Sequence, residues 1–153
     1  MSNIEILQFA ALNDNYGYLV HERSSGATAA IDTPEVAPLL AALDSKGWKL
    51  THILNTHHHF DHAGGNAELK EKTGCTIIGP KGEKDLIPGI DRAVGEGDIV
   101  EIGAARARVI DVPSHTRGHI AYHFADDHAV FVGDTLFALG CGRLFEGTPE
   151  QMW

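Results

Sequence analysis

The first half of the chain combines short apolar runs with one clear helical pattern. The apolar runs are bounded by Asn, Ser, Gly or Pro, as β-strands commonly are. They lie at residues 4–9, 16–20, 27–31, 50–54 and 76–78. Over residues 35–46 the apolar positions follow helical spacing and stop at Gly47, and a charged helix is expected over residues 66–72. Strands that alternate with helices predict a layered α/β fold in which helices cover a sheet.

Residues 105–112 alternate apolar and polar side chains one by one. Arg106 and Arg108 fall on one side, and the Ala and Val residues between them fall on the other. This period of two predicts a strand with one solvated face, paired with residues 99–102 through a turn at Gly103. Further strands are expected at residues 120–124 and 129–132. Antiparallel strands of this kind predict a mixed sheet. Residues 80–97 show no period and predict a loop or lid.

Composition and charge narrow the classes of function. The 153 residues are 43% hydrophobic and 22% charged, which is typical of one globular domain over residues 1–153. A formal charge of −9 argues against a nucleic-acid-binding protein, and no apolar run is long enough to cross a membrane. Cys75 and Cys141 are too few for a disulfide framework, and no leader sequence follows Met1. We therefore expect a cytoplasmic protein.

One stretch concentrates the candidate chemistry. Thr56-His57-His58-His59-Phe60-Asp61-His62 follows the strand at 50–54, so its side chains leave the carboxyl end of a strand. His57 and His59 can point the same way, while Asp61 and His62 lie in the next turn. Imidazoles suit zinc or iron, and a carboxylate adds the anionic ligand of a site that activates water. The stretch therefore predicts a loop that serves two adjacent metal ions. A tag or metal-buffering tract would be expected at a terminus instead.

Further strand ends carry candidate groups. His115 or His119 can supply the additional histidine that a three-ligand zinc site needs, and spacing does not choose between them. Asp134 follows the strand at 129–132 and is either a carboxylate shared by two metals or the cap of the next segment. Asp32 either caps the helix that follows it or supports the metal loop, and Pro34 favours the cap.

The other histidines are expected to be structural or at the surface. They are His21, His52, His58, His123 and His128. His58 alternates with the candidate ligands, so it should point away from them, toward solvent or an acceptor that supports the site. Cys141 has no partner nearby in sequence for metal binding or nucleophilic catalysis, and we expect it to be a small buried residue.

The candidate ligands resemble those of the metallo-β-lactamase superfamily. The matching residues are His57-x-His59-x-Asp61-His62, then His115, then Asp134. A wider similarity, to the glyoxalase II (hydroxyacylglutathione hydrolase) family, covers essentially the whole chain. It is carried by residues 12–19, 57–66, 114–120 and 131–137, and by Gly140-Cys141-Gly142-Arg143 with Phe145-Glu146-Gly147-Thr148. The last of these segments points to this family within the superfamily.

The resemblance implies an αββα sandwich with two divalent metals, zinc first and iron or manganese as alternatives. It implies hydrolysis of the thioester S-D-lactoylglutathione to D-lactate and glutathione by an activated hydroxide, in methylglyoxal degradation. One metal would be bound by His57, His59 and His115, and the other by Asp61 and His62. Asp134 would be shared, which makes Asp61 and Asp134 the catalytic carboxylates. Arg143 and the backbone near Phe145 would contact glutathione, although many members have Tyr where this chain has Phe145.

The chain also differs from the family. It has neither the Gly-His-Glu-Tyr segment that gives the second metal a further histidine nor the helical region that helps to hold glutathione. Thr148-Pro149-Glu150-Gln151 has the form of a capping box, and only two residues follow it. We therefore expect an N-terminal portion of a longer enzyme that lacks the last strands. A weak second metal site and self-association through the surface left by the missing part are expected with it.

Two other functions are compatible with the sequence. One is a different hydrolase of the same superfamily, acting on a lactone, a sulfur-linked substrate or a phosphodiester. The other is a metal-binding chain with little activity alone. Dependence on glutathione separates the first from glyoxalase II activity, and metal content without turnover would indicate the second.

Overall fold

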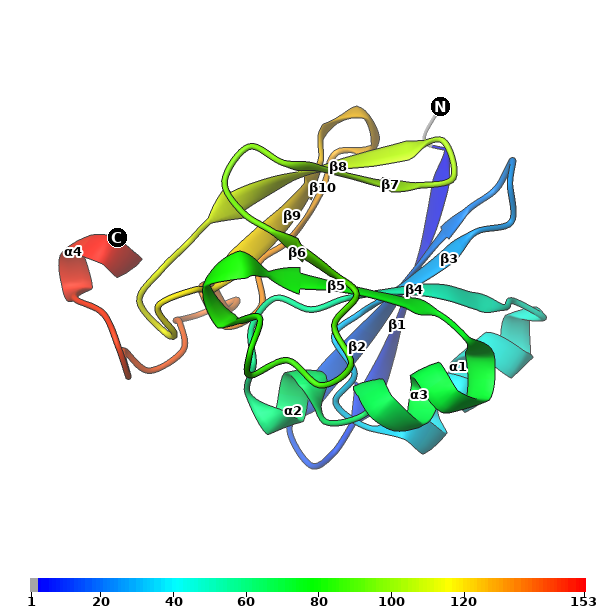
Figure 1. The fold of residues 1–153 in the computed structure, drawn as a ribbon, viewed down its shortest axis with the longest axis horizontal. Helices are drawn as coiled ribbons and strands as arrows, with labels where there is room; N and C mark the ends of the chain where they lie inside the picture. The colour runs from blue at the N-terminus through cyan, green and yellow to red at the C-terminus, as the bar shows by residue number, and fades with distance from the viewer. Residues whose placement is uncertain (1–2) are drawn as a thin grey trace.

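Two β-sheets packed face to face form the centre of the molecule, whose computed structural model describes residues 3–153 (Figure 1). The first sheet has the strand order β1-β2-β3-β4-β5-β6, and the second has the order β10-β9-β8-β7. The first comprises β1 (Ile4–Ala11), β2 (Asn15–Glu22), β3 (Thr28–Ile31), β4 (Leu50–Leu54), β5 (Thr76–Pro80) and β6 (Arg92–Val94). The second comprises β7 (Ile99–Ile102), β8 (Ala105–Asp111), β9 (Ile120–Phe124) and β10 (Ala129–Phe131).

The helices are short apart from α1. They are α1 (Val36–Lys46), α2 (Phe60–Ala63), α3 (Asn66–Thr73) and α4 (Pro149–Met152), with 3-10 turns η1 (Lys81–Glu83) and η2 (Ala125–Asp127). Gly47 and Gly74 end α1 and α3 in the left-handed conformation, as the sequence predicts. The capping box expected at the start of α4 is present, because Thr148 and Gln151 exchange hydrogen bonds between side chain and backbone. No helix within residues 3–153 is long and apolar enough to cross a membrane.

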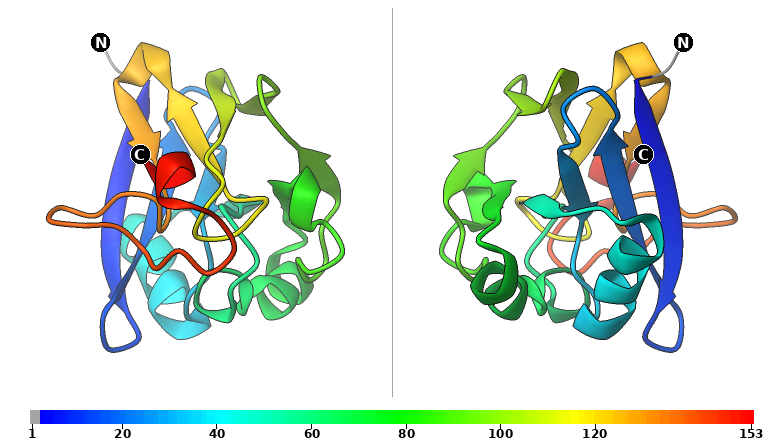
Figure 2. Two further views of the ribbon diagram at one scale, coloured as in Figure 1. Left: turned by 90° about the vertical axis from the view of Figure 1, so that its left-hand side faces the viewer. Right: turned by 90° about the vertical axis from the view of Figure 1, so that its right-hand side faces the viewer.

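The apolar side chains form two layers of core. Leu39 and Leu43 of α1 and Leu69 of α3 pack with Ile53 and Ile77 on one face of the first sheet. The other face packs on the second sheet, where Tyr122 and Phe124 are fully buried. Arg106 and Arg108 on the outer face of the second sheet are exposed. Helices, first sheet and second sheet thus form successive layers (Figure 2), which confirms the layered α/β fold and supplies three layers of the expected αββα sandwich.

Strand directions in the first sheet place the candidate residues. β1, β2 and β3 pair antiparallel, whereas β3, β4, β5 and β6 pair parallel. The carboxyl ends of β3, β4 and β5 therefore meet at one edge of the sheet. Asp32, the loop that begins after Leu54, and η1 all leave from this edge. The edge faces the connection from β8 to β9, as the hydrogen bond from the Ile120 N–H to the Thr56 carbonyl shows.

Two sequence predictions about strands were wrong. Residues 80–97, predicted as a loop or lid, contain η1 and β6. β6 has only three residues and pairs with β5 alone, so it is too short to show a period. The strands expected at 99–102 and 105–112 were predicted to belong to one mixed sheet, but β7 and β8 belong to a separate, entirely antiparallel sheet. The first sheet is mixed because β1 and β2 pair antiparallel with the parallel set. The single domain over residues 1–153 stays a prediction, and residues 1 and 2 lie outside the described residues.

Candidate metal centre

Three histidines from two sheets converge at the sheet edge. His57 and His59 follow β4, and His115 lies in the connection from β8 to β9. One ligand atom of each lies within 4.8 Å of the others, and Nε2 of His115 is 3.0 Å from Nδ1 of His59. We call these residues the three-histidine group. His57 and His115 are buried and His59 is partly exposed. Of the two histidines that the sequence left open, the structure brings His115 into this group.

Hydrogen bonds fix which nitrogen of each ring faces the site. The Thr56 hydroxyl donates its one proton to Asp32 (2.8 Å), so it accepts from Nδ1 of His57, which lies 2.9 Å away. The Arg143 carbonyl lies 2.7 Å from Nδ1 of His115 and can only accept. His57 and His115 therefore carry their protons on Nδ1. The Nε2 lone pair of His57 is left for another partner, whereas Nε2 of His115 faces Asp134 and His59.

The buried Nε2 of His57 has no hydrogen-bond partner among the described residues. A buried polar atom without a partner carries a desolvation cost, and such atoms are rare in folded proteins. Here the atom belongs to a group of three imidazole nitrogens at ligand-like spacing. Imidazole nitrogens are preferred donors for zinc and iron. The residues present therefore fit a divalent cation.

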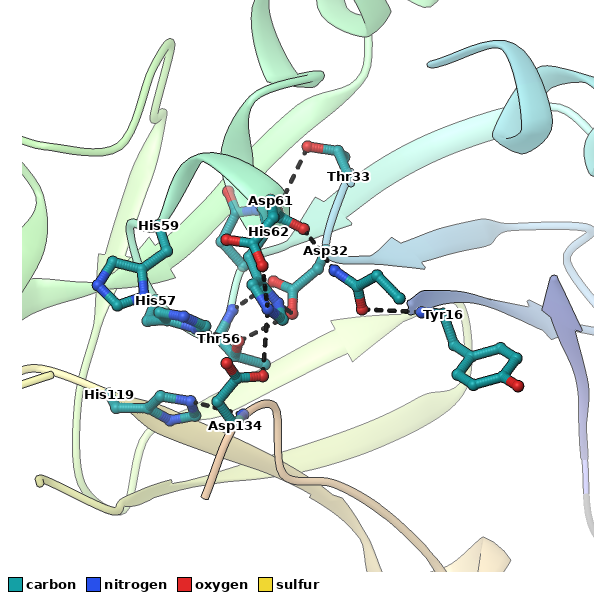
Figure 3. A network of polar contacts seen from close by, with 12 residues as sticks. Tyr16, Asp32, Thr33, Thr56, His57, His59, Asp61, His62, His119 and Asp134 are labelled. Atoms are coloured by element: carbon teal, nitrogen blue, oxygen red, sulfur yellow. Dashed lines mark hydrogen bonds and ion pairs between the residues drawn. The ribbon is translucent and has the colours of Figure 1, made fainter. Parts of the chain in front are cut away.

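Asp134 lies between the three-histidine group and His62. Its Oδ1 is 3.2 Å from Nε2 of His62 (Figure 3). Its Oδ2 is 3.2 Å from Nε2 of His115. Gly133 allows this approach, because its φ is +51° and a Cβ there would lie 2.6 Å from the Thr56 hydroxyl. The structure has no helix immediately after Asp134 that this residue could cap, which was the predicted alternative.

His62 and Asp61 form the second part of the site. The Nδ1 of His62 lies 2.8 Å from Oδ2 of Asp32, which leaves Nε2 facing Asp134 and, at 3.6 Å, Oδ2 of Asp61. The Asp61 side chain is 52% exposed. Its backbone carbonyl accepts a hydrogen bond from the Asn15 side chain, which ties the β1–β2 turn to the ligand loop. An open cavity of about 980 Å³ adjoins this part, lined among others by Tyr16, Asp61, His62 and Asp134.

The pKa shifts follow from burial and from these contacts. Burial, together with the neighbouring His62, keeps the pKa of His57 far below its usual range. Burial also opposes charge on His62, but Asp32 and Asp134 outweigh it and raise the pKa of His62 to about 10. Burial would raise the pKa of Asp134, yet hydrogen bonds from His115 and His62 hold it well below its usual range. A divalent cation would compete with the proton on His62, because both bind the same lone pair.

His119 is not a member of the three-histidine group, but it contacts the site. Its ring stacks on His57 with centroids 4.5 Å apart, and its Nε2 accepts the backbone N–H of Asp134 at 3.1 Å. Burial lowers the pKa of His119 to about 4, so the ring is neutral and can accept. His119 thus orients the backbone of Asp134. The sequence carried no signal of this role beyond the presence of the histidine.

The prediction that Asp32 caps the following helix was wrong. Helix α1 begins at Val36, and the residue before it, Glu35, makes no side-chain capping bond. Asp32 is buried with a φ of +59° and accepts hydrogen bonds from Thr56 and His62. The second reading of the sequence, support for the metal loop, describes its contacts. Pro34 favoured a cap because proline is common at the first position of a helix, but here it lies before α1 begins.

His58 points away from the three-histidine group, as expected. Its Nδ1 lies 2.8 Å from Oε2 of Glu83, a buried residue at the end of η1 that no motif in the sequence indicated. Cys141 is exposed, which contradicts the expected buried residue. The neighbouring Gly142, in contrast, is buried and packs against Asp134 and His115. His128 is also exposed, and His21, His52 and His123 are partly buried.

The segment after Asp134 covers one side of the three-histidine group. The ring of Phe145 lies 5.6 Å from that of His59 and 5.3 Å from that of His115, yet Phe145 is 60% exposed. The Glu146 N–H donates to the Ser114 carbonyl, and Glu146 Oε2 accepts from the Arg117 N–H. The Arg143 side chain is exposed, while its carbonyl orients His115. Both predicted substrate contacts therefore lie beside the site.

Comparison with known proteins extends these observations. The sequence profile of the Metallo-beta-lactamase superfamily matches residues 23–151. A hydroxyacylglutathione hydrolase of Hyphomonas neptunium is 65% identical over 98% of this chain and 59% of its own length. The crystal structure of ETHE1 from Myxococcus xanthus matches with a TM-score of 0.80 and 29% identity, over 95% of this chain and 66% of its own. The crystal structure of TTHA1623 in a di-iron-bound form matches with a TM-score of 0.78 and 26% identity, over 94% of this chain and 80% of its own. The chain spans about 60% of the length of its curated relatives.

Proposed function

The chain belongs to the metallo-beta-lactamase superfamily, and we propose that it binds two divalent cations and acts as a thioester hydrolase on S-D-lactoylglutathione. The observation that carries the proposal is the three-histidine group, in which the buried Nε2 of His57 has no partner among the described residues. The hydroxyacylglutathione hydrolase named above, 65% identical to this chain, supports the substrate class.

The proposed roles follow the geometry. His57, His59 and His115 hold the first cation, Asp61 and His62 hold the second, and Asp134 lies between the two groups and is shared. Zinc is the first choice, because imidazole and carboxylate ligands suit it, and iron or manganese fits the same donors. When bound, the cations supply Lewis-acid activation of water and of the thioester carbonyl.

The chain's own residues prepare the site for that chemistry. Three acceptors each keep a proton on Nδ1 of one histidine: the Thr56 hydroxyl on His57, Asp32 on His62, and the Arg143 carbonyl on His115. Each Nε2 is therefore directed into the site. Phe145 shields the rings of His59 and His115 from solvent on one side. The exposed guanidinium of Arg143 is suited to pair with a glutathione carboxylate on a chain of net charge −9. Thiolate is a good leaving group, so no strong general acid is required.

The proposal extends to the setting of the protein. We place it in the cytoplasm, where reduced glutathione is abundant and where the free Cys75 and Cys141 would stay reduced.

Leu136, Phe137 and Leu139 are exposed beside Asp134. Contiguous exposed apolar side chains favour association, and self-association through them is part of the proposal. Its measurement is the sedimentation of the chain at several concentrations.

Metal analysis combined with an S-D-lactoylglutathione assay on the same protein tests the proposed function. Two bound cations per chain and turnover that depends on them would support it. A matched thioester without the glutathione moiety serves as the control substrate. Equal turnover of both thioesters would reject glutathione as the recognised group and favour another hydrolase of the superfamily. Bound metal without any turnover would reject the enzymatic role of this chain alone.

A further inference from the structure

The three-histidine group depends on two loops that belong to different sheets. Residues 55–59 follow β4 in the first sheet, and residues 112–119 connect β8 to β9 in the second. Imidazole nitrogens bind a cation only when their spacing is held within a few tenths of an ångström of the ideal geometry. The hydrogen bond from the Ile120 N–H to the Thr56 carbonyl links the loops at their base. A second link is needed near the histidines themselves.

Glu83 contacts both loops with one carboxylate. Its Oε2 accepts the backbone N–H of His58 at 2.8 Å and lies 2.8 Å from Nδ1 of the same residue. Its Oε1 accepts the backbone N–H of Gly118 at 3.0 Å. The residue is 4% exposed, so these hydrogen bonds form out of water, where a donor without an acceptor is costly. One side chain therefore holds His58, which lies between two candidate ligands, and Gly118, which lies three residues after the third.

Two glycines bring the backbone of η1 against the second loop. A Cβ on Gly82 would lie 3.1 Å from the Cα of Gly118. A Cβ on Gly118 would lie 2.6 Å from Cγ of Glu83 and 3.0 Å from the carbonyl carbon of Gly82. Any larger residue would separate the two segments. This packing is a second observation, independent of the hydrogen bonds, that η1 is fitted between the loops.

We propose that Glu83 is a positioning residue that sets the distance between the two ligand loops, and through it the cation affinity of the three-histidine group. The inference rests on the metal binding in the proposed function. Glu83 does not reach the ligand nitrogens and acts through His58 and Gly118. A purely structural carboxylate would stabilise the fold without changing how well the folded chain binds a cation.

Glu83→Gln tests the proposal, with Glu22→Gln as the matched control. Gln offers one acceptor oxygen where the two loops need two, and its amide group would face a backbone N–H. Glu22 is also a buried glutamate that accepts backbone N–H groups, but its partners are Ser24, Ser25 and Ala104, away from the site. Zn²⁺ and Co²⁺ affinities are measured by competition with a chromophoric chelator. We expect Glu83→Gln to bind about 10–100-fold more weakly and Glu22→Gln to bind like the parent chain.

Equal affinities for Glu83→Gln and the parent would overturn the proposal, as would equal losses in the two variants. Glu83→Asp keeps the charge, shortens the side chain by one methylene and should lose one of the two loops. It is expected to bind Zn²⁺ more weakly as well, and parent-like affinity would also contradict a bridging role.

Hydrogen exchange of the metal-free chain separates this inference from the proposed function. Glu83→Gln should speed the exchange of the His58 and Gly118 amides, and Glu22→Gln should not. A parent chain that bound no cation would reject the proposed function, and the exchange rates would then decide the role of Glu83. If Glu83→Gln left the exchange rates of both loops unchanged, the positioning role of Glu83 would be rejected.

Discussion

Asp32 and His62 form a buried ion pair in which Oδ2 of the carboxylate lies 2.8 Å from Nδ1 of the imidazole. The same carboxylate accepts the backbone N–H and the hydroxyl of Thr56, and that hydroxyl accepts from His57. One carboxylate therefore orients a histidine in each of the two candidate cation positions. Its left-handed backbone conformation places it there, at the point where β3 ends.

Asp32→Asn should weaken both cation positions. Asparagine has one acceptor oxygen where Thr56 and His62 use two, so its NH₂ group must face either the Thr56 backbone N–H or both the Thr56 hydroxyl and His62 Nδ1. Either arrangement loosens the contacts that orient the two histidines. We expect cation affinity to fall by about 10–100-fold, and the breaking of the buried pair to destabilise the fold by about 3–5 kcal/mol. Chelator competition and thermal unfolding measure the two effects. Asp91→Asn, which changes a carboxylate paired with Lys70, is the control and should keep the parent affinity.

Asp134→Asn should remove most of the affinity for a second cation and lower turnover by orders of magnitude. Asp134 faces His115 with one oxygen and His62 with the other, and a neutral amide cannot hold two cations together. Metal content per chain and the rate of S-D-lactoylglutathione hydrolysis are the measurements. An unchanged stoichiometry with an unchanged rate would reject the shared role.

A calorimetric titration of Zn²⁺ into the metal-free chain should resolve two unequal steps. The three-histidine group has three ring nitrogens already within 4.8 Å of one another. The second position has His62, the shared Asp134 and Asp61, whose side chain is 52% exposed. Fewer and less ordered ligands give weaker binding, so the second step should appear only at excess metal. Two steps of equal affinity would contradict this order.

Arg143→Ala should raise KM for glutathione thioesters and leave kcat nearly unchanged. The carbonyl of residue 143, which orients His115, is retained in this variant, so only the exposed guanidinium is lost. Loss of binding that is equal in ground state and transition state appears in KM alone. Kinetics with a thioester that lacks glutathione provide the control. If KM for that substrate rose equally, Arg143 would not be a glutathione contact.

Glu22 should make the fold sensitive to acid. Hydrogen bonds from Ser24 and Ser25 hold the pKa of this carboxyl well below its usual range. A depressed folded-state pKa gives stability that is present above the unfolded pKa of about 4.3 and is lost as the pH falls below it. Thermal unfolding from pH 7 to pH 3 should therefore show Glu22→Gln less stable than the parent at pH 7, with the difference shrinking below about pH 4. A difference that stayed constant with pH would contradict this.

The position of the candidate ligand loop after a buried strand could be predicted because it depends only on neighbouring residues in the chain. Parallel pairing of β3, β4 and β5 brings their carboxyl ends to one edge of the sheet, and this does not depend on the conformation of the loops that follow. Several elements show clear hydrophobic periodicity or clear boundary residues in the sequence, and the structure contains them. They are the β1–β2 hairpin, α1 and the strands at 50–54 and 120–124. The choice of His115 over His119 came from family resemblance, since both histidines follow the same strand.

The rest depends on contacts between segments far apart in the chain. Asp32 and Thr56 are 24 residues apart, and Glu83 and Gly118 are 35 apart. No period or turn signal records such a pair. Glu83 lies in a stretch broken by Pro and Gly, and its burial is visible only once η1 is packed between two loops. The alternation of side chains missed the two-sheet division, which only the family resemblance implied through the αββα sandwich, because alternation identifies a strand but not its neighbour.

The members of the three-histidine group leave opposite walls of the sandwich, His57 and His59 from the first sheet and His115 from the second. A cation held among them would act as a removable cross-link between those walls. The resistance of the whole fold to unfolding would then follow the free cation concentration of its surroundings. At a concentration 100 times Kd the gain is about 2.7 kcal/mol. A cell that depletes its metal would thereby loosen the scaffold as well as empty the site.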